Sequence, residues 1–101
     1  MDQVIEFINN FKKGFDKKAI EDCFSFGNCY WFAKILQLRF GGNIYYSPVE
    51  NHFITRINYN NYDINGEYRP TEIFYEWGNY QRIEPLDSAR VIRDCINKEN
   101  I

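Results

Sequence analysis

The sequence predicts an α+β protein, in which helices pack on a small antiparallel sheet. Three observations lead to this prediction: apolar residues first recur at helical spacing, then alternate at strand spacing in the middle of the chain, and finally return to a helical pattern. The chain has 101 residues, of which 45% are hydrophobic and 19% aromatic. This size suits a single domain, residues 1–101, with a core built largely from aromatic rings.

Three helices are expected in the first part of the chain. Apolar residues three and four positions apart predict an amphipathic helix over about 2–13, and a shorter helix follows over 16–23, whose first residue is a favourable N-cap. Residues 25–28 have the composition of a loop. From 29 to 40 apolar residues dominate and turn signals are missing, which predicts a mostly buried helix ended by Gly41–Gly42.

The middle of the chain changes to strand patterns. Strands are predicted at 43–46, 51–59, 62–64 and 67–69. Asn65–Gly66 is the strongest local turn signal, because this pair suits the two-residue loop of a hairpin. A short helix over 71–77, capped by Thr71, and a C-terminal helix over 85–98 complete the predicted elements.

The charge pattern excludes a broad nucleic-acid surface. The formal net charge is −2 and the isoelectric point is near 5.3, so no general attraction for nucleic acid is expected. Lys12, Lys13, Lys17 and Lys18 form a local basic cluster, which we interpret as a solvated helix face. Nucleic-acid binding through this cluster is the least favoured of three functional hypotheses.

Neither a membrane segment nor a metal site is expected. The chain has no run of about 18 apolar residues, and its acidic N-terminus differs from a signal peptide, which favours the cytoplasm. Three cysteines and one histidine form neither a disulfide framework nor a zinc-binding pattern, so no cofactor is predicted. Cys23 and Cys95 are interpreted as core residues of their helices.

Cys29 is the strongest candidate for chemistry, because it opens the predicted buried helix directly after Gly27–Asn28. The start of a helix offers unpaired N–H groups and a positive dipole end, which stabilise a thiolate. The same N–H groups can receive the oxyanion of a tetrahedral intermediate. Such a thiol becomes a competent nucleophile once an imidazole lies near it.

His52 is the sole imidazole of the chain, and Asp63 is the candidate that would orient its ring. Strand register decides whether the two can meet. If Asn58–Tyr59 is the turn, Asp63 lies on the same face as His52, within about 5–8 Å at the backbone. If Asn60–Asn61 is the turn, the carboxylate lies roughly 20 Å away.

Each candidate also has a structural interpretation. Cys29 can be a small buried hydrophobe, His52 a structural residue, and Asp63 part of the turn that follows it. The functional hypothesis depends on all three occurring in a workable order, with the cysteine at a helix start.

The candidate residues lie in three short motifs. They are Gly27-Asn28-Cys29-Tyr30-Trp31-Phe32, Asn51-His52-Phe53 and Tyr62-Asp63-Ile64-Asn65-Gly66. Over about residues 25–66 the chain resembles the papain-like cysteine hydrolase superfamily, especially its compact transglutaminase-like and bacterial cell-wall-peptidase relatives. The resemblance implies a central helix that begins at the cysteine and packs on an antiparallel sheet, with the histidine and the acid on adjacent strands.

The resemblance also implies an activity. It predicts a thiol hydrolase or acyltransferase acting on an amide or ester bond, with Cys29, His52 and Asp63 as a catalytic triad and a peptide, amide or protein as substrate. Papain-type enzymes carry an oxyanion-hole Gln shortly before the cysteine, where this chain has residues 23–25. Asn28 or backbone N–H groups would take its place. The alternative is a binding protein that keeps the scaffold without turnover, such as a phage-encoded inhibitor of a host enzyme or defence system.

Overall fold

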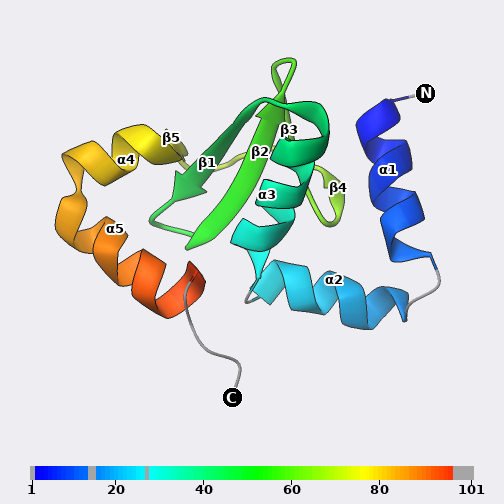
Figure 1. Cartoon of the computed structure of the whole chain (residues 1–101), viewed down its shortest axis with the longest axis horizontal. Coiled ribbons are helices and arrows are strands. Elements are labelled where there is room, and N and C mark those ends of the chain that lie inside the picture. Colours follow the sequence, from blue (N-terminus) through cyan, green and yellow to red (C-terminus); the bar gives the residue numbers. More distant parts are fainter. Residues whose placement is uncertain (1, 14–15, 27, 97–101) are drawn as a thin grey trace.

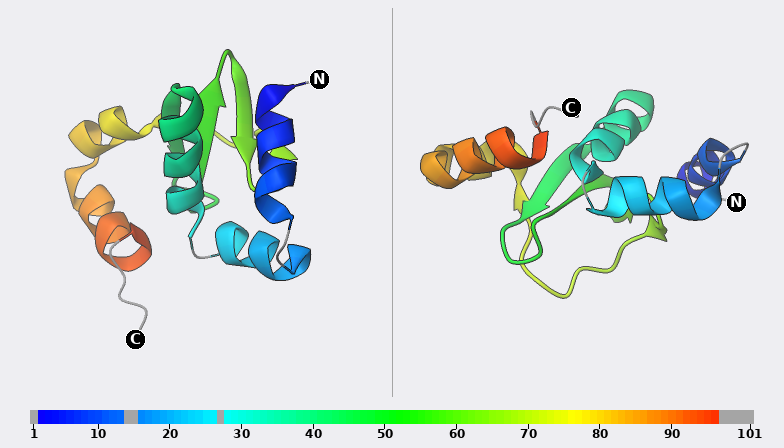
Figure 2. Two further views of the ribbon diagram at one scale, coloured as in Figure 1. Left: turned by 45° about the vertical axis from the view of Figure 1, so that its right-hand side comes forward. Right: turned by 90° about the horizontal axis from the view of Figure 1, so that it is seen from below.

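A computed structural model describes residues 2–13, 16–26 and 28–96, and over these residues the chain has the predicted α+β architecture (Figure 1). The described strands form a five-stranded antiparallel sheet in the order β4-β3-β2-β1-β5. They are β1 (Asn43–Ser47), β2 (His52–Ile57), β3 (Asn60–Asp63), β4 (Gly66–Glu67) and β5 (Tyr75–Glu76). The helical elements are α1 (Gln3–Lys12), α2 (Lys17–Phe26), α3 (Cys29–Phe40), α4 (Trp77–Ile83), α5 (Pro85–Val91) and the π-helical turn η1 (Ile92–Ile96). Helices gather on one side of the sheet, and the chain between β4 and β5 crosses the other side (Figure 2).

The first two helices begin where side chains cap them. The carboxylate of Asp2 accepts hydrogen bonds from the Val4 and Ile5 N–H groups at 2.7 and 3.3 Å. Asp16 caps α2 in the same way, because its carboxylate accepts hydrogen bonds from the Lys18 and Ala19 N–H groups in the first turn of α2. The second helix continues to residue 26, so the loop predicted over 25–28 is shorter than expected; residue 27 lies outside the described residues.

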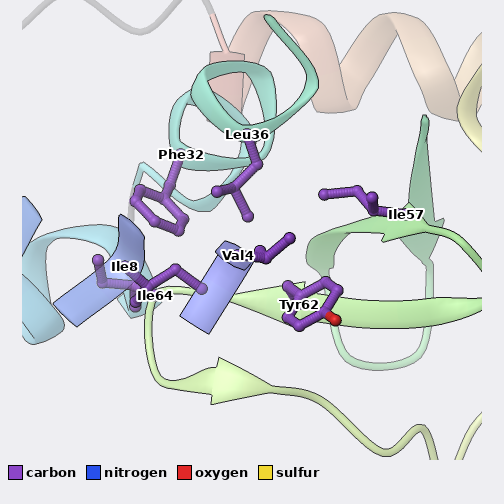
Figure 3. Packing of buried hydrophobic residues seen from close by; sticks show 7 residues of the cluster. All are labelled: Val4, Ile8, Phe32, Leu36, Ile57, Tyr62 and Ile64. Carbon is purple, nitrogen blue, oxygen red and sulfur yellow. The ribbon is translucent and has the colours of Figure 1, made fainter. Parts of the chain in front are cut away.

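One hydrophobic cluster joins α1 and α3 to the β2–β3 part of the sheet (Figure 3). Its buried members are Val4, Ile8, Phe32, Leu36, Ile57, Tyr62 and Ile64. Phe32 and Leu36 are four positions apart, so they project from the same face of α3 toward the sheet. The helix is further held by Thr55, whose Oγ1 donates to the Ala33 carbonyl at 2.8 Å in the buried interior. These contacts fix where the first residue of α3 lies relative to β2.

A second cluster packs α4 and α5 against β1 and β2, and it is built from aromatic rings as the composition predicts. The Phe53 ring lies 4.7 Å from that of Tyr46 and 5.0 Å from that of Trp77, measured between centroids. Tyr80 adds a further ring at 5.2 Å from Tyr46. Rings at these distances and tilts contribute beyond the apolar area that they bury.

The β2–β3 hairpin turns at Asn58–Tyr59, where both residues have positive φ angles of 50° and 70°. Such a pair forms the turn whose twist suits adjacent strands. The strand predicted over 51–59 therefore ends at Ile57 in the structure. The next hairpin opposes Asp63 to Gly66, so its loop residues are 64–65, one position before the predicted pair. Ile64 is fully buried in the core, which explains the displacement.

The helix predicted over 71–77 is wrong. Strand β5 pairs with β1 at Tyr75–Glu76, and α4 begins only at Trp77. The carboxylate of Glu76 caps this helix by accepting from the Asn79 N–H at 2.8 Å. The helix begins at Trp77 because the ring of this residue is buried against β1 and β2. That contact is between distant parts of the sequence, so a local pattern does not predict it.

The C-terminal helix begins at Pro85 as predicted and changes to a π-helical turn at Ile92. The predicted range 85–98 ends beyond the described residues. Among these residues no helix is both long and apolar enough to span a bilayer.

The basic cluster differs from the prediction in one respect. Lys12 is buried, with 7% of its side chain exposed, and its ammonium lies 2.9 Å from the Glu21 carboxylate. Lys18 lies 3.8 Å from Asp22 on the surface of α2. The helix face is therefore partly neutralised rather than wholly solvated, because α1 and α2 are tied together by an ion pair.

Candidate active site

Cys29 is the first residue of α3, as the sequence predicts, and its side chain is half-buried. The first intrahelical hydrogen bond runs from the Phe32 N–H to the Asn28 carbonyl at 3.2 Å. Asn28 is the N-cap residue, but its side chain accepts no capping hydrogen bond. The N–H groups of the first turn are therefore not occupied by the cap side chain.

The amide of Asn28, the predicted oxyanion donor, contacts Cys23 at the end of α2. Its Nδ2 lies 3.4 Å from the Cys23 carbonyl oxygen and 3.3 Å from the Cys23 sulfur. These contacts turn the amide toward α2. The backbone N–H groups of the first turn are thus the better-placed donors for an oxyanion at Cys29.

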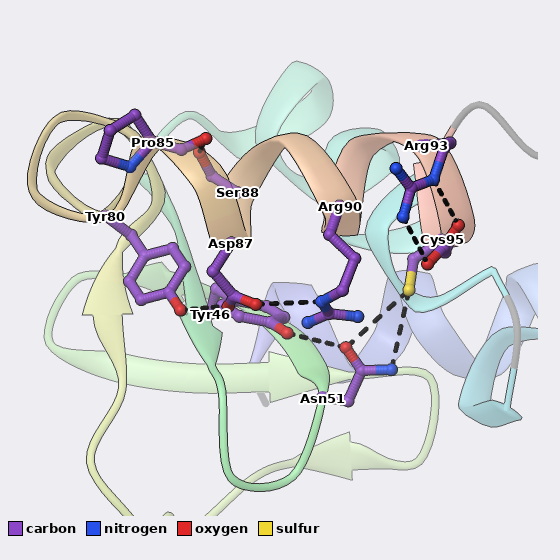
Figure 4. A network of polar contacts seen from close by, with 10 residues as sticks. Tyr46, Asn51, Tyr80, Pro85, Asp87, Ser88, Arg90, Arg93 and Cys95 are labelled. Carbon is purple, nitrogen blue, oxygen red and sulfur yellow. Dashed lines mark hydrogen bonds and ion pairs between the residues drawn. The ribbon is translucent and has the colours of Figure 1, made fainter.

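His52 is the first residue of β2, at the end of the sheet where α3 begins (Figure 1). The preceding residue, Asn51, has a φ of 51° in the left-handed region, which asparagine tolerates well. Its side chain accepts a 2.7 Å hydrogen bond from the Tyr46 hydroxyl and contacts the sulfur of Cys95 at 3.6 Å (Figure 4). The residue before the imidazole is therefore held by both β1 and η1.

Asp63 ends β3 in the first of the two registers considered. Thr55 pairs with Tyr62, and continuing this register places Ile54 opposite Asp63. The carboxylate Oδ2 lies 3.1 Å from Nε2 of His52. The other oxygen, Oδ1, accepts from the Asn65 N–H at 2.8 Å. One oxygen of Asp63 therefore contacts the imidazole, and the other accepts from the backbone of the following turn.

The electrostatics of His52 reflect two partners. Burial of the ring lowers its pKa, but hydrogen bonds with Asp63 and with the Cys29 side chain, and the charges of both groups, raise the pKa from 6.5 to about 9. Because a carboxylate only accepts, the Nε2 proton points to Asp63, which leaves Nδ1 as the ring nitrogen for Cys29. The structure thus brings the three residues together, with the side chains of His52 and Asp63 only 14% and 9% exposed.

Two residues at this site were missed by the sequence reasoning. The ring of Tyr68 packs against His52 with 5.4 Å between centroids, and its hydroxyl donates to the carboxylate of Glu50. Burial and this hydrogen bond raise the pKa of Tyr68, so the hydroxyl remains a donor. Tyr68 lies opposite Asn61 in the pairing of β3 with β4, and Asn61 and Asp63 are two positions apart, so Tyr68 and Asp63 share a face of the sheet. The alternation of side chains along the predicted strand after Asp63 is therefore the signal that could have found Tyr68.

The other two cysteines differ from Cys29. Cys23 is exposed, so its interpretation as a core residue is wrong: it lies at the end of α2, where Asn28 rather than the core contacts it. Cys95 is half-buried beside Asn51. Across the described part of the chain, no three His, Cys, Asp or Glu side chains are arranged to hold a metal ion.

The aromatic residues of β1, α3 and α4 differ in burial. Tyr46 and Trp77 are buried in the core, whereas Trp31 is 44% exposed on the first turn of α3. Its indole N–H donates to the Ile96 carbonyl at 3.2 Å, which ties the start of α3 to η1.

The sequence model of the family described as "Phage YunG-like protein" matches residues 5–100, nearly the whole chain. No curated protein and no solved structure matches it.

Proposed function

The chain belongs to the Phage YunG-like family, and from the geometry of its site we propose that it is a thiol hydrolase or acyltransferase that acts on an amide or ester bond. The observation that carries the proposal is the 3.1 Å contact between His52 and Asp63, on a ring whose pKa is also raised by Cys29 at the start of α3. A structural histidine needs one partner, whereas this ring has an orienting acid on one nitrogen and a nucleophile for the other.

In the proposed reaction, the Cys29 sulfur attacks the substrate carbonyl carbon, and the carbonyl electron pair moves onto oxygen. Backbone N–H groups of the first turn of α3 stabilise the resulting oxyanion. His52 gives its Nδ1 proton to the leaving amine or alcohol as the carbon–nitrogen or carbon–oxygen bond breaks. Water or an acceptor amine then attacks the thioester carbonyl carbon, and His52 takes up the proton released in that step. The carbon–sulfur bond breaks with its electron pair going to sulfur, which releases the acyl product and regenerates Cys29.

The raised pKa of His52 supports this role. A ring with a pKa of about 9 is protonated at neutral pH, so it carries the proton that the leaving group needs. Asp63 holds the ring in place during transfer of the proton, since its own oxygen accepts from Nε2. A free thiol of this kind stays reduced in a cytoplasm, which is where we propose the protein acts.

The thiol chemistry is tested by comparing cysteines within the chain. Iodoacetamide should alkylate Cys29 about tenfold faster than Cys23 at neutral pH, as expected of an activated thiolate. Exposure alone predicts the opposite order, because Cys23 is exposed and Cys29 half-buried. Mass spectrometry of digested protein reads out each site separately.

The matched control is His52→Gln, which should slow alkylation of Cys29 and leave that of Cys23 unchanged. If Cys29 reacts no faster than Cys23 in the wild-type protein, the proposed activation is wrong.

A second candidate function is a binding protein that keeps this scaffold without turnover, as expected of a phage inhibitor of a host enzyme. The observation that favours it is the family match together with apolar side chains in solvent, such as Leu86 at 88% and Leu38 at 76% exposure. The two functions separate in a cellular assay of the phage protein's effect on its host. A Cys29→Ala variant that retains the full effect supports binding, and one that loses it supports catalysis.

A further inference from the structure

The imidazole of His52 is bounded on one side by the ring of Tyr68. The two rings are 5.4 Å apart between centroids and inclined by 49°. A histidine ring rotates about its last side-chain bond in a broad, shallow well, so an attached hydrogen bond alone holds its plane loosely. A second ring packed against it restricts that rotation.

Tyr68 is held in place at three points. Its backbone N–H donates to the Asn61 carbonyl at 2.7 Å, which continues the pairing of β3 and β4. Its hydroxyl donates to the Glu50 carboxylate, and the Phe74 ring packs against its own ring at 5.6 Å. Glu50 is itself fixed, because its N–H donates to the Ser47 hydroxyl at 3.1 Å.

The contact between Tyr68 and Glu50 joins the two segments that carry the imidazole and its acid. Glu50 stands two residues before His52, in the connection from β1 to β2, and Tyr68 follows Asp63 by five residues, beyond the next turn. The hydroxyl bond links the β1–β2 connection to the residue that follows β4, and the Tyr68 ring lies beside His52 at this point.

We propose that Tyr68 is a positioning residue for His52: its ring, anchored by Glu50, shields the His52–Asp63 hydrogen bond from water and holds the imidazole in the plane that reaches Cys29. The inference rests on the proposed function, since it assigns Tyr68 a part in that site. A hydrogen bond screened from water in a low-dielectric setting is stronger than an exposed one, and its proton exchanges more slowly.

The test measures the exchange of the His52 ring proton with water by nuclear magnetic resonance. The chain has one histidine, so the imidazole N–H signal is unambiguous. Tyr68→Leu removes the ring and should speed exchange of the Nε2 proton by about tenfold or more, as expected when a protected site opens locally. Tyr68→Phe keeps the ring but loses the bond to Glu50, and it should change the rate by less than about threefold.

Two controls separate shielding from a general loosening of the fold. The Thr55 amide lies in the central strand β2, and its exchange should be the same in Tyr68→Leu as in the wild-type protein. Tyr75→Leu removes another half-buried ring, which packs on Tyr80 at the opposite edge of the sheet, and should leave the imidazole proton unaffected.

The proposal is overturned if Tyr68→Leu leaves the imidazole exchange rate unchanged, or if the Thr55 amide accelerates in parallel. The two proposals can fail separately. Equal alkylation of Cys29 and Cys23 would reject the hydrolase function, whereas the exchange measurement decides whether Tyr68 shields the imidazole. If both hold, Tyr68→Leu should also slow alkylation of Cys29, and Tyr68→Phe should largely restore its rate.

Discussion

Replacing Asp63 by asparagine tests the electrostatics of the site on one atom pair. The change keeps the shape of the side chain but removes the charge that faces Nε2 of His52 at 3.1 Å. The rise in the pKa of His52 from 6.5 to about 9 corresponds to about 3 kcal/mol of preference for the charged ring. Burial of the ring opposes this preference, and the hydrogen bond that His52 donates to Asp63 is the largest contribution that raises the pKa, followed by that with Cys29.

Asp63→Asn should therefore lower the pKa of His52 from about 9 toward 6.5. The measurement is a pH titration of the imidazole carbon-bound protons, which are unique because the chain has a single histidine. Asp22→Asn is the matched control, since Asp22 pairs with Lys18 on the surface of α2 and should leave the titration unchanged. Cys29→Ala measures the share that belongs to the thiol, and the double variant with Asp63→Asn shows whether the two effects add.

One result would refute the reasoning about the site. If Asp63→Asn titrates at the same pH as the wild-type protein, then Asp63 does not hold the charged imidazole, and the orienting role assigned to it is wrong. A titration near 6.5 in the wild-type protein would contradict the raised pKa itself.

Three further outcomes follow from the structure. The pKa of His52 is higher in the folded than in the unfolded chain, so its stabilising effect is complete below about pH 6.5 and is lost as the pH rises through about 9. Urea titrations at a series of pH values should show this loss of stability in the wild-type protein and a smaller loss in His52→Gln. Gly42→Ala should lower the free energy of unfolding by at least about 1 kcal/mol more than Gly41→Ala, because both residues have positive φ but only at Gly42 would a Cβ lie 2.2 Å from the Arg56 carbonyl oxygen. Thr55→Val should cost about 1–2 kcal/mol in the same assay, since it leaves the buried Ala33 carbonyl without the hydroxyl that donates to it; equal stability would show that this bond contributes nothing.

The elements that the sequence predicts well are those with a local cause. The start of α1 follows from the Asp2 cap, and α3 covers residues 29–40 as predicted because an uninterrupted apolar run ends at two glycines. The segment between Pro70 and Pro85 was predicted poorly. Its structure depends on Trp77 reaching the rings of β1 and β2 and on β5 pairing with β1, and those partners are about 25–30 residues away in the sequence.

The candidate site shows the same division. The sequence by itself determined that Cys29 opens a helix and that His52 is the only base available, because helix starts and composition are local properties. Only the tertiary structure decided that Asp63 meets His52, since turns at 58–59 and at 60–61 both suit the local residues, and the choice depends on which side chains each register buries. The same register brings Tyr68 onto the imidazole and Glu50 onto Tyr68, through contacts between segments that share no local pattern.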